Sequence, residues 1–421
     1  MATIGRKLMT LAVAAALGGM ASNAVAGGFA IGTQSGSGTG NAFAGGAAAA
    51  DDASVVWYNP AAMTVLPTGN NISGALHVLK PSFKFTNTGS TGVFLGAGTG
   101  DGGDGGDWAY VPNVFYTTSF GPQWRFGVAL NVPFGLKTEY DPGWRGRFAA
   151  ILSEIKTVNI NPSVAYKVSD TVSIGGGLSV QRIEAELSSL SATGAGTTTL
   201  NADDTGYGFN LGAVFQPVPS TRIGISYRSQ IEYELTGDIT FSAAPPGNGG
   251  VKADLKVPDS ASFSVFHSLN PYWELMGDLT WTGWSSLQQL RVIRTTGAGA
   301  GTTLFTLPFN WDDTWRYSVG ANYKMSSQTK LRFGAALDKT PTNDVDRTPR
   351  LPDQDRTWLA FGVQWRPSKA GILDFGYAHE FIKDASVNSP VTGATSCAAG
   401  CVTGTFKNKA DIFSIQYSHS F

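Results

Sequence analysis

Apolar and polar residues alternate along most of the chain after residue 70. The clearest run is 357–366, where Leu359, Phe361 and Trp365 stand at odd positions between small or polar residues. A period of two places successive side chains on opposite faces of a β-strand. The pattern predicts an all-β fold with fourteen strands, near residues 70–80, 108–118, 124–133, 156–167, 171–187, 205–216, 221–234, 261–269, 272–282, 313–324, 329–338, 356–366, 371–382 and 409–421.

The polar positions of these strands indicate which face looks outward. They carry Arg222, Arg316, Glu274 and Asp374, among other charged residues. A membrane barrel turns such residues toward its lumen, because an arginine on the lipid face at mid-bilayer costs about 2 to 4 kcal/mol. The alternation therefore favours a barrel in lipid over a soluble sandwich.

Connections between the strands alternate between short and long. The long ones run to roughly 15 to 30 residues rich in Gly, Ser, Thr and Pro, as external loops of membrane barrels do. The short ones are residues 119–123, 168–170, 217–220, 270–271, 325–328 and 367–370. This sorting predicts a 14-stranded antiparallel transmembrane β-barrel over residues 70–421.

The first 26 residues have the order of a secretory signal peptide. Arg6 and Lys7 precede an apolar run, and Ala24 and Ala26 frame the expected cleavage site. The apolar run is too short for a transmembrane helix, and no later run reaches about 18 apolar residues. We therefore expect an exported chain that crosses the bacterial outer membrane with strands and contacts its lipid.

Residues 27–69 do not alternate and are rich in Gly, Ala and Ser. Two interpretations fit such a segment: a disordered leader, or a plug packed inside the lumen. Trp57, Tyr58, Met63 and Leu66 favour packing, because a disordered leader has little use for large apolar residues. We predict an N-terminal plug (hatch) in the lumen.

Charge and motifs exclude several classes of function. The 30 basic and 31 acidic residues leave a net charge of −1, so nucleic acid is not an expected partner. The four histidines stand in no catalytic or metal-binding motif, and we expect no enzyme activity, no cofactor and no metal site. His379 and Glu380 are neighbours in a strand, so they point to opposite faces and cannot act as a pair.

Cys397 and Cys401 are the only cysteines of the sequence. In an oxidising compartment we expect them to form a local disulfide, with two free thiols as the alternative. A glycine-rich run with Asp101, Asp104 and Asp107 is interpreted as a flexible turn rather than a calcium site, because no full repeat follows it.

Two features of individual strands carry hypotheses. The last strand ends on Phe421, four residues after Tyr417, and this resembles the C-terminal signal that barrel assembly machinery reads; the alternative is an ordinary final strand. The third strand contains Pro133, which cannot donate to a ladder, and Gly135, which marks a bend. We place a lateral opening of the wall there, although Pro133 could equally just end the strand.

Five short motifs are spread from the start of the plug segment to the twelfth predicted strand. Together they resemble the outer-membrane long-chain fatty acid transporter family, which also includes channels for toluene-like hydrocarbons. The motifs are Gly28-Phe29, Ala50-Asp51-Asp52-Ala53, Asn59-Pro60-Ala61, Trp281-Thr282-Gly283-Trp284-Ser285 and Pro352-Asp353-Gln354-Asp355-Arg356-Thr357-Trp358.

This resemblance implies a mechanism without an aqueous pore. A substrate binds among the external loops, passes to an apolar pocket beside the plug, and leaves sideways through the wall. The resemblance makes Phe29 the residue near the mature N-terminus that touches the pocket. Motion of this end of the plug opens the route. It makes Asn59, Pro60 and Ala61 the fixed bend of the plug.

The expected substrate is a long-chain fatty acid, which needs an apolar slot and a cation for its carboxylate. Arg182, Arg316 and Arg356 are candidate lumen cations, and the alternative for each is an ion pair with a wall carboxylate. An aromatic or alkane hydrocarbon would need only the slot. A general diffusion porin, with a water-filled pore, is a further alternative, as is a purely structural or adhesive barrel.

Overall fold

The computed structural model describes residues 27–91, 98, 100–191, 194–297, 299–391, 394 and 396–421. The predicted signal segment, residues 1–26, lies outside this part. The strand segments are β1 (Asn70–Asn87), β2 (Ala109–Phe120), β3 (Trp124–Asn131), β4 (Gly135–Glu139), β5 (Leu152–Lys167), β6 (Val172–Leu190), β7 (Thr197–Val218), β8 (Thr221–Arg228), β9 (Ile231–Phe241), β10 (Gly249–Val257), β11 (Ser260–Ser268), β12 (Trp273–Thr282), β13 (Gln289–Arg294), β14 (Thr303–Pro308), β15 (Thr314–Lys324), β16 (Thr329–Asp338), β17 (Arg356–Trp365), β18 (Gly371–Ile382), β19 (Ala385–Pro390) and β20 (Cys401–Ser420).

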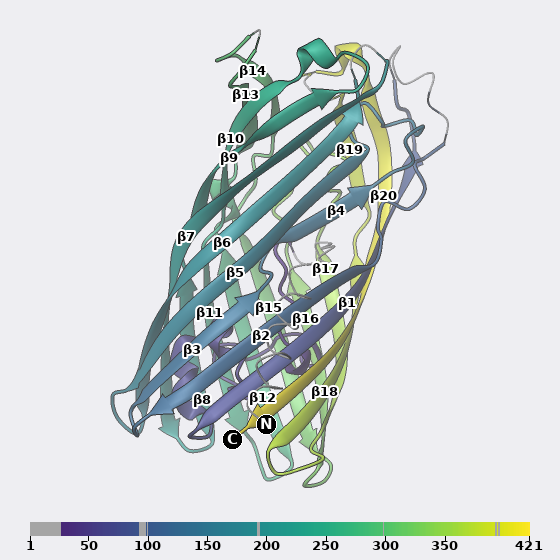
Figure 1. The fold of residues 1–421 in the computed structure, drawn as a ribbon. Coiled ribbons are helices and arrows are strands. Elements are labelled where there is room, and N and C mark those ends of the chain that lie inside the picture. The colour runs from purple at the N-terminus through teal and green to yellow at the C-terminus, as the bar shows by residue number, and fades with distance from the viewer. Residues whose placement is uncertain are drawn as a thin grey trace.

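These segments form one antiparallel sheet that closes on itself (Figure 1). The first strand pairs on one side with β2 and on the other with β20, where Asn71 faces Ser420 and Asn87 faces Gly404. Six strands are interrupted once each, namely β3/β4, β8/β9, β10/β11, β12/β13, β14/β15 and β18/β19. The twenty segments in the described residues therefore make fourteen strands, which confirms the predicted closed barrel.

The two faces of the wall differ as the alternation predicts. Large apolar side chains such as Leu359, Phe361 and Phe375 are exposed on the outside, where lipid surrounds the barrel. The charged residues Asp374 and Glu380 are buried on the lumen side of the same strands. Across the described residues, no helix is long and apolar enough to span a bilayer.

Short turns and longer connections lie at opposite ends of the barrel (Figure 1). The longer connections are shorter than predicted, because the strands continue past the apolar band: β6 runs to Leu190 and β7 begins at Thr197. These extensions lack the apolar alternation, since both faces of a strand can be polar above the bilayer. The periodicity therefore marks the membrane-facing part of each strand rather than its full length.

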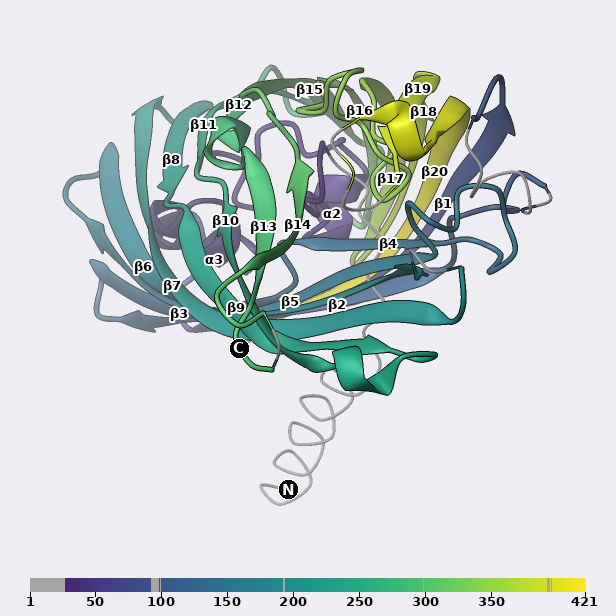
Figure 2. The ribbon, with the colours of Figure 1, turned by 90° about the horizontal axis from the view of Figure 1, so that it is seen from above.

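The segment before β1 is folded inside the ring of strands, as Figure 2 shows for α2 (Gly36–Thr39) and α3 (Val55–Tyr58). A 3-10 helix, η1 (Pro60–Val65), follows them; the remaining 3-10 turns are η2 (Pro245–Gly247), η3 (Trp284–Ser286) and η4 (Cys397–Ala399). Glycines let this segment touch the wall. A Cβ on Gly376 of β18 would lie 2.7 Å from the Gly36 carbonyl oxygen.

The C-terminal end closes the barrel at the short-turn rim. Phe421 exchanges backbone hydrogen bonds with Asn70, at 2.8 and 2.9 Å. The side chains of Tyr417 and Phe421 are exposed on the outer face, 47% and 66% respectively. They contribute no packing to the lumen, and an assembly role for them stays a prediction.

Replacing Phe421 by Ser tests that role. We expect less assembled barrel in the outer membrane, because the terminal ring is available for recognition and carries no lumen contact. The measurement is the fraction of heat-modifiable, folded protein in purified outer membranes. The control is Phe381→Ser, which removes another exposed outer-face ring; equal folded levels for the two variants would contradict the terminal-signal reading.

Candidate transport site

The third strand of the barrel is broken between Asn131, where β3 ends, and Gly135, where β4 begins. The ladder between β2 and β3 stops at the pair Val114 and Leu130. Beyond it, β4 pairs with β5, and in the described residues it forms no ladder with β2. The first residues of β2 therefore have a partner strand on the β1 side alone. This is the position that the sequence indicated through Pro133 and Gly135.

The N-terminal end of the plug occupies the break. Ile31 donates its backbone N–H to the Pro133 oxygen at 2.8 Å, and Gly135 donates to the Phe29 oxygen at 2.9 Å. Ala30 and Phe134 form an isolated antiparallel bridge between these bonds. The plug end thus replaces the missing strand over a few residues.

Gln34 and Asn113 hold the same place with side-chain bonds. The Gln34 amide donates to the oxygens of Ile31 at 2.7 Å and Val132 at 2.9 Å. Asn113 of β2 accepts a bond from the Val132 N–H at 3.3 Å and donates to the Gln34 oxygen at 3.1 Å. Gln34, Asn113 and Val132 are all buried. The two bonds between Gln34 and the wall therefore depend on the plug end staying in place.

The ring of Phe29 is 3% exposed and lies in an aromatic cluster. Its centroid is 5.0 Å from Trp284, 5.8 Å from Phe134 and 5.9 Å from Trp311. Trp284 belongs to one of the recognised motifs, whereas Trp311 lies in the break between β14 and β15. Trp284, in η3, and Trp311 thus lie at two separate breaks of the wall, and Phe29 packs against both.

Two carboxylates hold the residues just before Phe29. The backbone N–H of Gly28 donates to Asp353 at 2.8 Å, and that of Gly27 donates to Asp338 at 3.3 Å. Asp353 also accepts a bond from the Thr340 hydroxyl at 2.6 Å and pairs with Arg356. The Pro352–Trp358 motif therefore positions the start of the plug.

Asn59 links the body of the plug to the wall and is fully buried. Its amide donates to the oxygens of Ala47 at 2.8 Å and Ala213 at 3.0 Å, and its own oxygen accepts from Ala61 at 3.1 Å. Asn59 also caps η1, in which Pro60 takes the first position. The structure thus places the Asn59-Pro60-Ala61 motif at a bend fastened to β7.

A buried ion network fastens the plug on the opposite side. Asp51 pairs with Arg332 at 2.7 Å and with Lys330 at 3.5 Å. Arg332 in turn pairs with Asp374 at 3.0 Å, and Lys330 pairs with Glu274 at 3.2 Å. The body of the plug is therefore bound to wall strands through charges that are costly to separate, whereas its N-terminal end is held mostly by neutral bonds.

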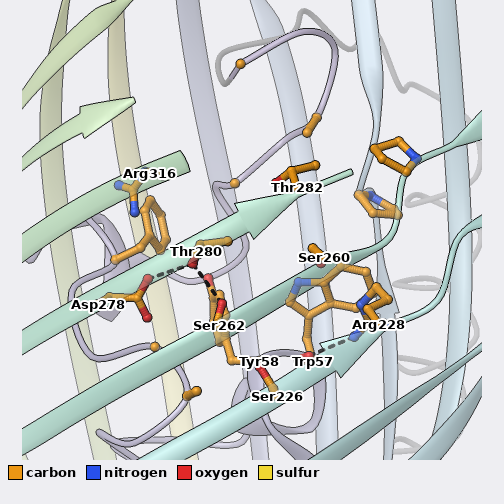
Figure 3. A pocket seen from close by; sticks show the side chains of 18 of the residues that line it. Trp57, Tyr58, Ser226, Arg228, Ser260, Ser262, Asp278, Thr280, Thr282 and Arg316 are labelled. Atoms are coloured by element: carbon orange, nitrogen blue, oxygen red, sulfur yellow. Dashed lines mark hydrogen bonds between the residues drawn. The ribbon is translucent and has the colours of Figure 1, made fainter. Parts of the chain in front are cut away.

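A lumen cavity of about 210 Å³, with polar and apolar groups on its walls, lies between the plug and the strands β8, β11, β12 and β15 (Figure 3). Arg316 borders it and donates to the Ala42 oxygen at 2.6 Å. Arg228 borders it too, donating to the Trp57 oxygen at 2.8 Å with its guanidinium 3.4 Å from the Trp57 ring centroid. The lining also includes hydroxyl groups, which belong to Ser226, Ser260, Ser262, Thr280 and Thr282.

An apolar pocket of about 70 Å³ lies on the loop side of Phe29, which lines it. Its walls are mainly aliphatic residues of β6, β7, β9, β10, β13 and β14, together with Trp311 and Leu351. Arg350 is a cation of this pocket and donates to the Leu152 oxygen at 3.1 Å and the Ser153 hydroxyl at 3.0 Å. Burial lowers the pKa of Arg350 to about 10, which leaves it charged at neutral pH.

The three predicted arginines have different surroundings. Arg316 faces the lumen cavity as expected. Arg356 is buried but pairs with Asp353 and with Glu380 at 3.0 Å, which is the structural alternative. Placing Arg182 in the lumen was wrong: its side chain is 52% exposed on the outer wall and pairs with Glu184 and Asp203.

The remaining predicted residues lie away from the cavities. Cys397 and Cys401 form a disulfide within the loop after β19. The Asp104 carboxylate accepts bonds from Ser82 and from the Phe83 N–H, so it folds its loop onto β1. Among the described residues, no group of His, Cys, Asp or Glu is arranged to hold a metal ion.

The chain matches a family model described as outer membrane protein transport protein (OMPP1/FadL/TodX) over residues 18–421. It belongs to this family. The long-chain fatty acid transport protein of Escherichia coli K12 is 26% identical, covering 90% of this chain and 92% of that protein. Outer membrane protein P1 of Haemophilus influenzae Rd is 28% identical, covering 90% of each.

Solved members of the family share the fold. A Pseudomonas aeruginosa FadL homologue has a TM-score of 0.85 and 26% identity, covering 94% of this chain and 100% of that chain. The Ralstonia pickettii toluene transporter TbuX has a TM-score of 0.63 at 20% identity, covering 88% of this chain and 94% of that chain. This FadL-family member is accordingly an outer-membrane transport protein and not an enzyme.

Sequence reasoning missed the partners that complete the site. Arg350 stands two residues before the Pro352–Trp358 motif, and that proximity is the one signal that pointed to it. Gln34, Asn113 and Trp311 carry no local signal, because their roles arise from contacts between segments far apart in the chain.

Replacing Asn59 by Ala tests whether it fastens the plug. Removing hydrogen bonds that leave buried groups unpaired costs about 1 to 3 kcal/mol, so plug displacement should rise roughly five- to hundredfold. In planar bilayers we expect little conductance from the wild type and frequent openings from the variant. Asn388→Ala, in β19 on the outer wall, should behave as wild type; large, steady wild-type conductance would contradict a closed plug.

Proposed function

We propose that this FadL-family protein imports long-chain fatty acids across the outer membrane. The observation that carries the proposal is the apolar pocket with Arg350 on its wall. Aliphatic side chains suit an alkyl chain, and a desolvated guanidinium suits a carboxylate. The long-chain fatty acid transport proteins among its relatives support the same substrate class.

The closed pocket requires a conformational change before it accepts any such ligand. Its volume is about 70 Å³, whereas a cavity of about 150 Å³ holds benzene. Phe29 lines this pocket, and its neighbours Gly27 and Ala30 line the lumen cavity beyond it. A ligand that enters displaces Phe29 and with it the end of the plug. Transport is then passive and gated by the ligand.

The exit in this proposal is the break between β2 and β4. Displacing the plug end removes its backbone bonds to Pro133 and Gly135, so the residues of the break lose these partners beside the unpaired edge of β2. The outward face of β2 meets lipid, so an apolar ligand can leave sideways into the membrane at this point. The outer-membrane lipid is the acceptor.

An aromatic hydrocarbon is the second candidate substrate. The rings of Phe29, Phe134, Trp284 and Trp311 form an aromatic cluster at the plug end. A hydrocarbon needs no cation. A general diffusion porin is less well supported, because the plug buries Asn59 and Asp52 inside the lumen. Arg350 favours the acid over the hydrocarbon.

Uptake of labelled oleate, oleyl alcohol and toluene separates these candidates. Cells lacking their own transporter would express the wild type, Arg350→Gln or Arg182→Gln. We expect Arg350→Gln to raise the apparent KM for oleate about tenfold or more, since a bond to a charged group is lost, and to leave oleyl alcohol uptake unchanged. Arg182→Gln should match the wild type. Wild-type uptake of toluene but not oleate would move the protein to the hydrocarbon channels.

Replacing Phe29 by Ala tests ligand gating. We expect several-fold slower oleate uptake at normal levels of assembled barrel, because a ligand can no longer displace the plug end by pushing on the Phe29 ring. Phe43→Ala removes a buried ring from the body of the plug and should leave the apparent KM unchanged. Unaltered uptake by the Phe29 variant would remove the gating role.

A further inference from the structure

Four lysines project from the outer wall where β1 and β20 run side by side (Figure 1). Lys84 of β1 stands directly opposite Lys407 of β20, and Lys409 stands opposite Ser82. Lys80 lies on the same face of β1, with its ammonium 4.7 Å from the centroid of the Trp108 ring. We call Lys80, Lys84, Lys407 and Lys409 the lysine patch.

The patch carries more positive than negative charge, with four lysines near Asp411 and Asp104. Like charges directly across an antiparallel pair are destabilising, because their Cβ atoms lie about 4.5 to 5.5 Å apart. In the described residues Lys80, Lys407 and Lys409 form no ion pair, and Lys84 reaches Asp104 only at 3.9 Å. Asp411 stands opposite Lys80 in the ladder, but its carboxylate is bonded by Tyr377 and His379, each at 2.7 Å.

Other lysines of the outer wall are arranged differently. Lys252 and Lys256 of β10 also lie above the apolar band, but each pairs with a glutamate of the neighbouring strand. The partners are Glu234 at 3.0 Å and Glu232 at 2.6 Å. The facing pair Lys84 and Lys407 therefore departs from the charge pairing that the same wall uses elsewhere.

The height of the patch is set by the residues beneath it. Toward the short-turn rim, the outward positions of β1 and β20 are apolar up to the facing pair Val78 and Phe413. The next outward pair is Lys80 and Asp411, and the other lysines of the patch follow it. Tyr110 and Trp108, exposed at the top of β2, mark the same level as interfacial aromatics do. The ammonium groups therefore stand at the headgroups of the outer leaflet.

We propose that the lysine patch binds the phosphate groups of the phosphorylated glycolipid that forms the outer leaflet, lipid A of lipopolysaccharide. A bound phosphate bridges Lys84 and Lys407 and removes their repulsion, while Lys80 and Lys409 contact the same headgroup. Acyl chains of this lipid then run down the apolar face of β1, one strand from the break between β2 and β4.

The test measures lipid A binding to purified, delipidated protein in mild detergent, by native mass spectrometry and by thermal shift. Each lysine near an anionic headgroup contributes about a fivefold gain in affinity. Lys84→Gln with Lys407→Gln should therefore weaken binding of bisphosphorylated lipid A about twenty-five-fold. The control pair, Lys252→Gln with Lys256→Gln, should bind as wild type.

Two further readouts make the result decisive. Without lipid A, the Lys84/Lys407 variant should be at least as heat-stable as the wild type, because a repulsion has been removed. Wild-type protein alone should prefer bisphosphorylated over dephosphorylated lipid A, a comparison that needs no variant. Equal binding of these two lipids, or unchanged lipid A binding by the variant, would overturn the proposal. Equal stabilisation by inorganic phosphate would show a free-anion site instead.

Discussion

Backbone polar groups cannot remain unpaired at membrane depth, and this constraint organises the whole molecule. Fourteen strands satisfy it by closing the sheet between β1 and β20. At the break between β3 and β4, where β2 loses its next neighbour, backbone groups of residues 133–135 find other partners. Ile31 and Phe29 of the plug bond Pro133 and Gly135, and the Thr157 hydroxyl bonds the N–H and oxygen of Phe134. Wall and plug are therefore one hydrogen-bonded unit at this point.

This dependence explains how a small displacement acts on the wall. The body of the plug is held by Asn59 and by the charges around Arg332. Its first residues rest on a few backbone bonds, on hydrogen bonds to two wall carboxylates, and on an aromatic cluster. In the proposed cycle, only the end that completes the wall has to move. The apolar pocket above Phe29 and the lumen cavity below it then have distinct roles. The first selects the ligand, and the second gives the plug end room.

Particular residues show how far the sequence could be interpreted. The fourteen strands, the lumen position of Arg316 and the break at Pro133 followed from local patterns. Arg182 was misplaced because it stands just above the apolar band on β6, where an outward charge meets water and pairs with Glu184. Alternation identifies a face, but the cost of a charge on that face depends on its height in the bilayer.

The sequence alone determined the fold class, because a period of two, charges on one face of the strands and alternating connection lengths are local properties that together fit a closed barrel in lipid. It also determined the family, through short motifs that can each be recognised locally in the chain. Tertiary structure decided which residues meet. Gly28 contacts Asp353 across 325 positions of the chain, and Asn59 contacts Ala213 across 154. Such contacts depend on sheet closure and register, which no local pattern encodes.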